Sequence, residues 1–230
     1  MRNGIIMVLL LVGGVAQGAS LNSQLLAGND LLQTGQAAEA LEAFNALQVE
    51  YPDAAAVQFG IGASYYQMAE HHASQGAVEE SVAAFKEAEQ HFDRLSHSDT
   101  ASIQRHGAFN RANCLAQTAK LSAEQPELAQ AAVGQFKAAI EAYEQVVDAY
   151  PDHGQAQQNL DHVRYALKVL EQQLEEQKQE QDEEQKEDQQ PPEQAFVMLQ
   201  RATTDINNAD ARPNEAGDTV QLYYGEGGQK

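Results

Sequence analysis

A block of sequence that occurs twice constrains the fold of this 230-residue chain more than any other feature. Residues 40–44 read Ala-Leu-Glu-Ala-Phe and lead to Tyr-Pro-Asp at 51–53. Residues 139–143 read Ala-Ile-Glu-Ala-Tyr and lead to Tyr-Pro-Asp at 150–152. Two similar blocks with equal internal distances indicate an internal repeat, and such repeats are typical of stacked arrays.

The spacing inside each block is that of a helix with one apolar face. Ala40, Phe44 and Leu47 are four and three residues apart, which places them on the same side of a helix. The second block repeats this face at Ala139, Tyr143 and Val146. The proline that follows each block ends the helix, because proline lacks an N–H donor and clashes with the preceding turn.

Two glycines upstream of the first block predict a partner helix. Gly28 is placed where that helix must approach its neighbour closely, and Gly35 ends it before a turn. Leu31 fills the face between them. Residues 21–54 therefore form one helix–turn–helix unit of about 34 residues.

These positions resemble the consensus of the tetratricopeptide repeat (TPR). The matching small, large, turn, alanine, aromatic and proline positions are Gly28, Leu31, Gly35, Ala40, Phe44 and Pro52. A second unit begins at Ala55 and carries extra residues around its turn, so extended helices are expected there. A third unit contains Cys114 and Tyr143 and has a still longer insert around residues 118–135. The matching positions in these two units are Gly62, Tyr65, Ser81, Phe85, Ala88, Ala112, Leu115, Ala139, Tyr143, Val146 and Pro151.

A final helix should cap the array, and a change of composition should end it. Ala156, Leu160, Val163 and Leu167 share one face, which predicts a capping helix over 154–170. The expected fold is therefore an all-α TPR solenoid of three irregular units plus a cap, spanning residues 21–170. Residues 171–192 are a Gln/Glu-rich low-complexity segment into which the cap helix should continue before it frays. Residues 193–230 are expected to be a flexible tail with one short helix near 195–202.

The N-terminus has the pattern of a cleaved export signal at residues 1–18. Arg2 precedes an apolar run that is shorter than the ~20 residues a membrane-spanning helix needs. Small residues at Ala16, Gly18 and Ala19 suit a signal peptidase, which predicts cleavage near Gly18 or Ala19. We expect a periplasmic protein with no membrane span after cleavage; retention of the segment as an anchor is the alternative.

The order of these parts resembles the TPR proteins of bacterial aerotolerance (Bat) operons. The resemblance lies in Phe-Asn-Arg-Ala-Asn at 109–113, Pro-Asp at 151–152, Asn-Leu at 159–160 and the acidic run from Glu171. It covers roughly residues 105–190. It implies a helper of envelope complexes that contain von Willebrand factor type A domain proteins, with a role in stress tolerance.

The net charge of −20 disfavours nucleic acid and anionic lipid as partners. No phosphate-binding loop, nucleophile elbow or zinc-spaced Cys/His set occurs, so no cofactor and no catalytic residue is expected. The pairs His71–His72 and His91–His97 lack the spacing of metal ligands on a helix and are expected at the surface. Cys114 lies between apolar residues and is expected to be a half-buried, inert thiol.

The first helices of a TPR array line a concave groove, which is the expected site of partner binding. Counting from the consensus assigns to it Asn29, Gln33, Phe59, Tyr66, Gln67, Phe109, Asn113, Gln117, Gln158, His162 and Tyr165. Aromatic rings with amides suit a peptide ligand, although Phe59 and Phe109 could equally pack between repeats. The groove should lack the Lys and Arg residues that clamp a C-terminal carboxylate in some TPR proteins.

The sequence thus predicts a non-catalytic protein-interaction scaffold in the bacterial envelope. The alternative is a TPR accessory subunit of a cell-wall, secretion or other envelope enzyme machine. Both readings use the same residues.

Overall fold

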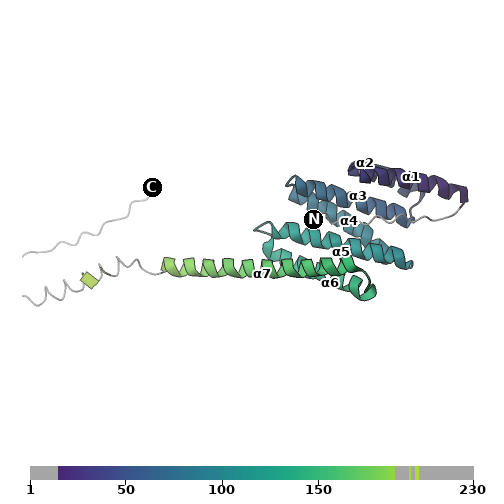
Figure 1. Cartoon of the computed structure of the whole chain (residues 1–230). Helices are drawn as coiled ribbons and strands as arrows, with labels where there is room; N and C mark the ends of the chain where they lie inside the picture. The colour runs from purple at the N-terminus through teal and green to yellow at the C-terminus, as the bar shows by residue number, and fades with distance from the viewer. Residues whose placement is uncertain (1–14, 190–196, 198–199, 202–230) are drawn as a thin grey trace, which may run out of the picture. The chain divides into compact units, whose positions relative to one another are not determined.

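The computed structural model describes residues 15–189, 197 and 200–201 of the chain, and all regular elements within them are helices. Their bounds are α1 (Val15–Gln33), α2 (Ala37–Glu50), α3 (Ala55–Ser74), α4 (Val78–Ser96), α5 (Ala101–Ala123), α6 (Ala129–Ala149) and α7 (Gly154–Gln189). Helices α1 and α2, α3 and α4, and α5 and α6 form hairpins, and each hairpin packs against the next (Figure 1). The predicted all-α solenoid of helix–turn–helix units is confirmed.

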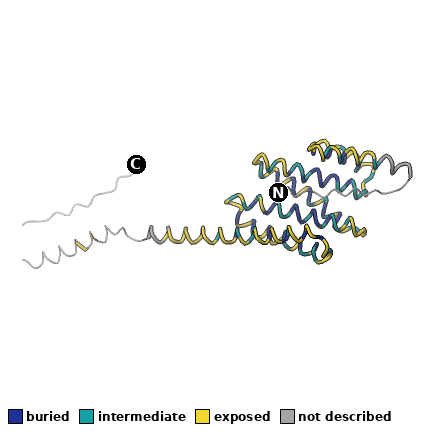
Figure 2. The backbone as a smooth tube through the Cα atoms, viewed as in Figure 1, coloured by how far each residue is buried: buried dark blue, intermediate teal, exposed yellow. Residues whose placement is uncertain are grey.

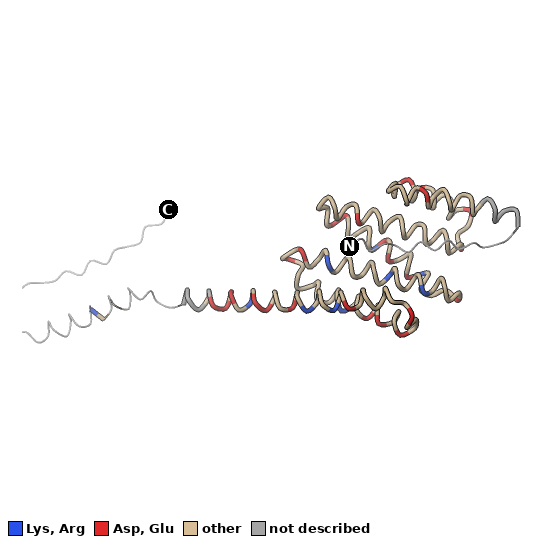
Figure 3. Tube along the Cα trace, in the orientation of Figure 1, with Lys and Arg blue, Asp and Glu red and all other residues tan. Residues whose placement is uncertain are grey.

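The chain divides into two units, residues 1–177 and 178–230, and all three hairpins belong to the first. Helix α7 begins in the first unit and continues past Leu170 into the acidic run, as the sequence predicted. Its side chains between Glu175 and Glu183 are exposed (Figure 2). In the described part of this stretch acidic residues far outnumber the single lysine, Lys178 (Figure 3).

Most of the predicted signal segment and of the predicted tail lies outside the described residues. Positions 15–18 are helical and belong to α1, and residues 197, 200 and 201 are helical. The predictions of a signal at 1–18 and of a flexible tail at 193–230 stay predictions. Among the described residues, no helix combines the length and the apolar character that crossing a bilayer requires.

The first turn shows why the sequence places glycine at position 35. Gly35 has φ +81°, a left-handed conformation that residues with a Cβ adopt only at a cost. The backbone N–H of Gly35 donates to Leu32 O at 3.1 Å, and that of Gln36 donates to Leu31 O at 2.9 Å. This pattern closes the C-terminus of α1 and turns the chain into α2. Gly76, at φ +75°, ends α3 in the same way.

Phe44 packs where two glycines make room for its ring. A Cβ added to Gly28 of α1 would lie 2.6 Å from Phe44 Cζ, and one added to Gly60 of α3 would lie 2.5 Å from Cε1. Phe44 itself is fully buried. The close approach predicted at Gly28 is therefore confirmed, and the aromatic position of the first repeat joins α1, α2 and α3.

The extra residues of the second and third units lengthen their helices. Helices α3 and α4 contain 20 and 19 residues, and α5 and α6 contain 23 and 21, against 14 in α2. The predicted cap also forms, because Ala156, Leu160, Val163 and Leu170 of α7 are buried in one apolar cluster with α5 and α6. This cluster positions α7 beside α5 and so forms a groove between the two helices.

Candidate functional site: a groove between α5 and α7

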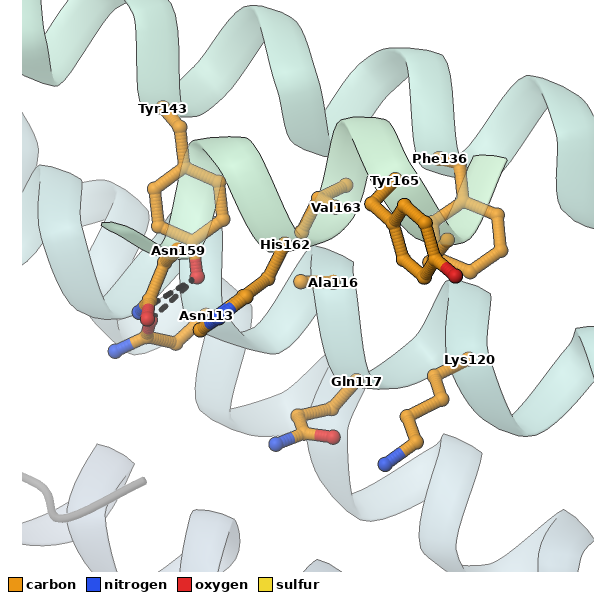
Figure 4. Close-up of a pocket in the computed structure, with 11 residues that line it drawn as sticks. Asn113, Ala116, Gln117, Lys120, Phe136, Tyr143, Asn159, His162, Val163 and Tyr165 are labelled. Atoms are coloured by element: carbon orange, nitrogen blue, oxygen red, sulfur yellow. Dashed lines mark hydrogen bonds between the residues drawn. The ribbon is translucent and has the colours of Figure 1, made fainter. Parts of the chain in front are cut away.

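Helices α5 and α7 form the walls of a groove, and α6 contributes to its floor (Figure 4). The cavity has a volume of about 370 Å³, within the range of ligand-binding clefts. Its α5 wall uses positions three and four residues apart, which share one helical face. The lining residues are Asn113, Ala116, Gln117, Lys120, Phe136, Tyr143, Asn159, His162, Val163, Tyr165 and Ala166.

One end of the groove is a hydrogen-bonded polar cluster of three side chains. The Tyr143 hydroxyl donates to Asn113 Oδ1 at 2.6 Å, and Asn159 Nδ2 donates to the same oxygen at 3.0 Å. Asn159 Nδ2 also lies 3.3 Å from the Tyr143 oxygen. Burial raises the pKa of Tyr143, so its hydroxyl keeps the proton that it donates. The cluster fixes α5, α6 and α7 to one another at this end.

The other end of the groove combines an aromatic ring with a cation. Tyr165 of α7 is 69% exposed, an unusual degree for a tyrosine on a structured helix. Phe136 of α6 is buried beneath this end, and the exposed Lys120 projects from the α5 wall (Figure 4). Lys120 forms no ion pair within the described residues. Gln117, one turn before Lys120, places its Nε2 at 3.5 Å from the Tyr66 hydroxyl.

Four of the residues predicted for partner binding meet in this groove. They are Asn113, Gln117, His162 and Tyr165. His162 and Tyr165 are exposed on α7, whereas Asn113 and Gln117 belong to α5. The structure brings these four side chains together, and their binding of a partner stays a prediction.

Two predicted groove residues are core residues instead, so the expectation that their rings face a partner is wrong. Tyr66 is fully buried, and its ring packs edge-to-face on Phe85 with 5.1 Å between centroids. Phe109 is 3% exposed, and its ring lies 4.4 Å from that of His153 and 6.3 Å from that of Tyr143. For Phe109 the packing alternative holds, because the ring fills the space where α5, α6 and the start of α7 meet.

The remaining predicted residues do not line this groove. Phe59 is half-buried and packs its ring edge-to-face against Phe92, with 5.5 Å between centroids, so the packing alternative holds for it as well. The others are amide side chains elsewhere on α1, α3 and α7: half-buried Asn29 and Gln67, and exposed Gln33 and Gln158.

The sequence analysis did not assign seven of the lining residues to the groove, among them Lys120, Phe136, Tyr143 and Asn159, and its expectation of a groove without cations is wrong. Lys120 lies seven residues after Asn113, so the helical spacing that selected Asn113 and Gln117 could have found it. Tyr143 and Phe136 belong to the second helix of their hairpin, which the consensus assigns to the core. Asn159 could also have been found from the sequence, because its side chain lies three residues, about one turn, before that of His162 on the capping helix.

Burial favours the neutral forms of several side chains outside the groove. Burial and, to a smaller degree, the charge of Arg94 lower the pKa of His91 to about 4. Burial also raises the pKa of the Cys114 thiol, which is 1% exposed rather than half-buried. Within the described ranges, no three His, Cys, Asp or Glu side chains gather in a way that could hold a metal ion.

Comparison with known families agrees with this geometry. Residues 25–96 and 128–160 match the model of the tetratricopeptide repeat family. The first stretch reaches from α1 to the end of α4, and the second runs from just before α6 into α7. No protein of curated function matches the chain. The helical hairpins, the glycine turns and the matched residues together show that residues 25–96 and 128–160 contain tetratricopeptide repeats.

Proposed function

We propose that the chain is a non-catalytic scaffold whose groove between α5 and α7 binds a segment of another protein. The observation that carries the proposal is the exposed Tyr165 ring beside an open cleft that also presents polar side chains. Exposed aromatic rings near polar groups are enriched where proteins bind one another. Repeat arrays commonly use such concave surfaces for recognition.

The chemistry of the buried nucleophiles supports binding over catalysis. Burial raises the pKa values of both the Cys114 thiol and the Tyr143 hydroxyl. A nucleophile needs the opposite change, because its deprotonated form is the reactive one. The Tyr143 hydroxyl in addition donates a hydrogen bond to Asn113 Oδ1, which suits a structural role.

At the cellular level we propose an exported, periplasmic protein that assists an envelope complex with von Willebrand factor type A domain proteins in stress or aerotolerance. The support is the export pattern at residues 1–18 and the resemblance to Bat-operon TPR proteins over residues 105–190. The second candidate is an accessory subunit of an envelope enzyme machine, which the same TPR array would suit.

Two measurements separate these cellular roles. N-terminal sequencing of the mature protein should begin near Gly18 or Ala19, and an intact Met1 in the membrane fraction would indicate an anchor instead. Affinity purification from cross-linked envelopes should recover a von Willebrand type A protein. Recovery of a cell-wall or secretion enzyme in its place would support the second candidate.

The groove itself is tested by the same purification with single substitutions. Tyr165→Ala and Gln117→Ala should reduce recovery of the partner, because truncation of an interface anchor costs on the order of 2 kcal/mol. Gln158→Ala is the matched control, since Gln158 is an exposed amide of α7 outside the groove. Equal recovery by groove and control variants would show that the partner binds elsewhere.

A further inference from the structure

We propose that the groove between α5 and α7 selects a polypeptide segment in which an acidic side chain stands next to an aromatic or aliphatic one. The inference rests on the proposed function and adds the chemistry of the partner. Lys120 would bind the carboxylate, Tyr165 and Val163 would contact the apolar side chain, and the amides would bond the backbone of the segment.

The composition of the lining is the first observation. The chain contains 34 acidic residues against 14 lysines and arginines. None of the 11 residues that line the groove is acidic, whereas one is lysine and one is histidine. A carboxylate-free cleft in so acidic a protein leaves a local surface that attracts negative charge.

Lys120 is the second observation. Lys86, Arg94 and Lys168 also lack an ion pair among the described residues, but none of them lines the groove. Four other cations have carboxylate partners. Arg105 pairs with Asp152 at 3.2 Å, Arg111 with Asp93 at 2.9 Å, Lys137 with Glu171 at 3.5 Å, and Arg164 with Glu144 at 2.6 Å. Lys120 has no such partner among the described side chains. Its ammonium group is thus free to pair with the carboxylate of a ligand.

Three further clefts of the described array differ in this respect. The cleft between α4, α5 and α6 contains Arg111, but Asp93 also lines it and pairs with that arginine. The cleft at the hairpin turns is lined by three glutamates, Glu79, Glu80 and Glu127. The cleft at the start of α7 holds Arg105 together with Asp152. The groove beside α5 and α7 is therefore distinguished by a cation without a neutralising partner in its lining.

The apolar requirement follows from the side chains around Lys120. Figure 4 shows Tyr165, Phe136 and Lys120 at the same end of the groove, with the amides of Asn113 and Asn159 at the other. The ring of Tyr165 is exposed, so a ligand side chain that covers it removes apolar surface from water. Asn159 uses its Nδ2 within the polar cluster, which leaves its Oδ1 as an acceptor for a ligand N–H.

The test is selection from a random dodecapeptide library displayed on phage, with the purified full chain as bait. Baits are the wild type, Tyr165→Ala, Lys120→Gln, Lys120→Glu and Lys168→Glu. Lys168 is an exposed lysine of α7 that does not line the groove, so its substitution controls for net charge. Circular dichroism melts of all five proteins confirm equal folding.

We expect wild type and Lys168→Glu to enrich Asp or Glu beside an aromatic or aliphatic residue. A selected peptide with an amidated C-terminus should bind Lys120→Gln about fivefold more weakly, as for the loss of a solvent-exposed ion pair of about 1 kcal/mol. Lys120→Glu should reverse the preference toward basic peptides.

Different results would overturn the acidic preference and the binding groove itself. Peptides whose binding depends on Tyr165 but not on acidic residues or on Lys120 would overturn the acidic preference and leave a binding groove. Peptides insensitive to Tyr165 and Lys120 alike would overturn the groove itself. A preference of more than about tenfold for a free C-terminal acid over the amide would overturn recognition through a side-chain carboxylate.

Discussion

At the scale of single residues, two aromatic rings that the repeat consensus treats alike have opposite environments. Phe109 is 3% exposed and touches the rings of Tyr143 and His153. Tyr165 is 69% exposed. A side chain stabilises the fold only to the extent that folding removes it from water, so the two rings should contribute very differently to stability.

We predict that Phe109→Ala lowers the free energy of unfolding by about 3–5 kcal/mol, because truncation of a buried phenylalanine loses its contacts and leaves a cavity. Tyr165→Ala should change it by less than about 0.5 kcal/mol. Urea denaturation followed by circular dichroism measures both values. Similar values for the two variants would mean that Phe109 is not the packing residue described here, or that Tyr165 is covered in solution.

At the scale of elements, the start of α7 depends on a histidine cap. Nδ1 of His153 accepts a hydrogen bond from the backbone N–H of Ala156 at 3.3 Å, and the same N–H donates to the His153 carbonyl oxygen at 2.9 Å, so this donor of the first turn is shared between the two. Only the unprotonated nitrogen can accept. Burial lowers the pKa of His153, and the charges of Arg105 and His106 lower it further, while Asp152 opposes them.

This cap should make stability depend on pH. The pKa of an unfolded histidine is about 6.5, and the folded value is lower, so below pH 6.5 the unfolded state binds a proton that the folded state excludes. The stability present at pH 7.5 is therefore lost as the pH falls below 6.5. His91 and His106, whose pKa values are also lowered, contribute with the same sign.

We predict that His153→Asn reduces the loss of stability between pH 7.5 and pH 5.5. Asparagine caps helices well and does not titrate in this range. The variant also loses the ring contact with Phe109, so the diagnostic quantity is the change with pH and not the absolute stability. Urea denaturation at both pH values measures it. An unchanged pH dependence would show that the other histidines account for all of it.

The elements themselves were largely predictable, but the faces of the longer helices were not. Gly28, Gly35 and Phe44 fall at consensus spacing in a unit of standard length, and the structure places all three as predicted. Tyr66 lies on α3, which the extra residues of its unit lengthen to 20 residues. Each residue turns a helix by about 100°, so a small shift of register exchanges a groove position for a core position.

The same argument explains the gaps in the predicted site. Counting consensus positions along α5 correctly placed Asn113 and Gln117 in the lining of the groove, but the count was not extended by one more turn to Lys120. Tyr143 and Asn159 join the groove only because α6 and α7 approach α5 at this end, and sequence spacing carries no information about distances between helices. Side chains on the wall of a groove can be assigned from the spacing along one helix, whereas those on its floor can be assigned only when the relative positions of three helices are known.

At the scale of the whole molecule, the array should depend on α7 only as far as its apolar face extends. Leu160, Val163 and Leu170 are buried against α5 and α6. Beyond Leu174, the described residues of α7 up to Glu183 are exposed and polar. This described part of the helix therefore adds no buried apolar side chain to the cluster that it forms with α5 and α6.

We predict that a chain ending at Gln177 melts within a few degrees of the full-length protein. A chain ending at Asp152 should melt far lower or aggregate, because each large apolar side chain removed from the interface contributes about 1.5–3 kcal/mol. Differential scanning calorimetry compares the three proteins. A large loss on truncation at Gln177 would show that residues beyond it stabilise the repeats.

The position of Cys114 allows separation of the second and third hairpins to be detected chemically. It is the only cysteine in the chain, and it is buried with Tyr66, Phe85 and Phe92 between the second and third hairpins. A thiol reagent should reach it only when these hairpins separate, so its labelling rate counts opening events in the middle of the array.

We predict that a disulfide reagent labels native Cys114 more slowly than the unfolded chain by several orders of magnitude. The substitution Phe109→Ala should reduce this difference between the two labelling rates. Absorbance of the released thiolate measures both rates. Rapid labelling of the native protein would contradict the burial described here. The single thiol thus reports opening of the array. It does not react while the molecule is folded, and each molecule that opens in an oxidising environment can be oxidised there once.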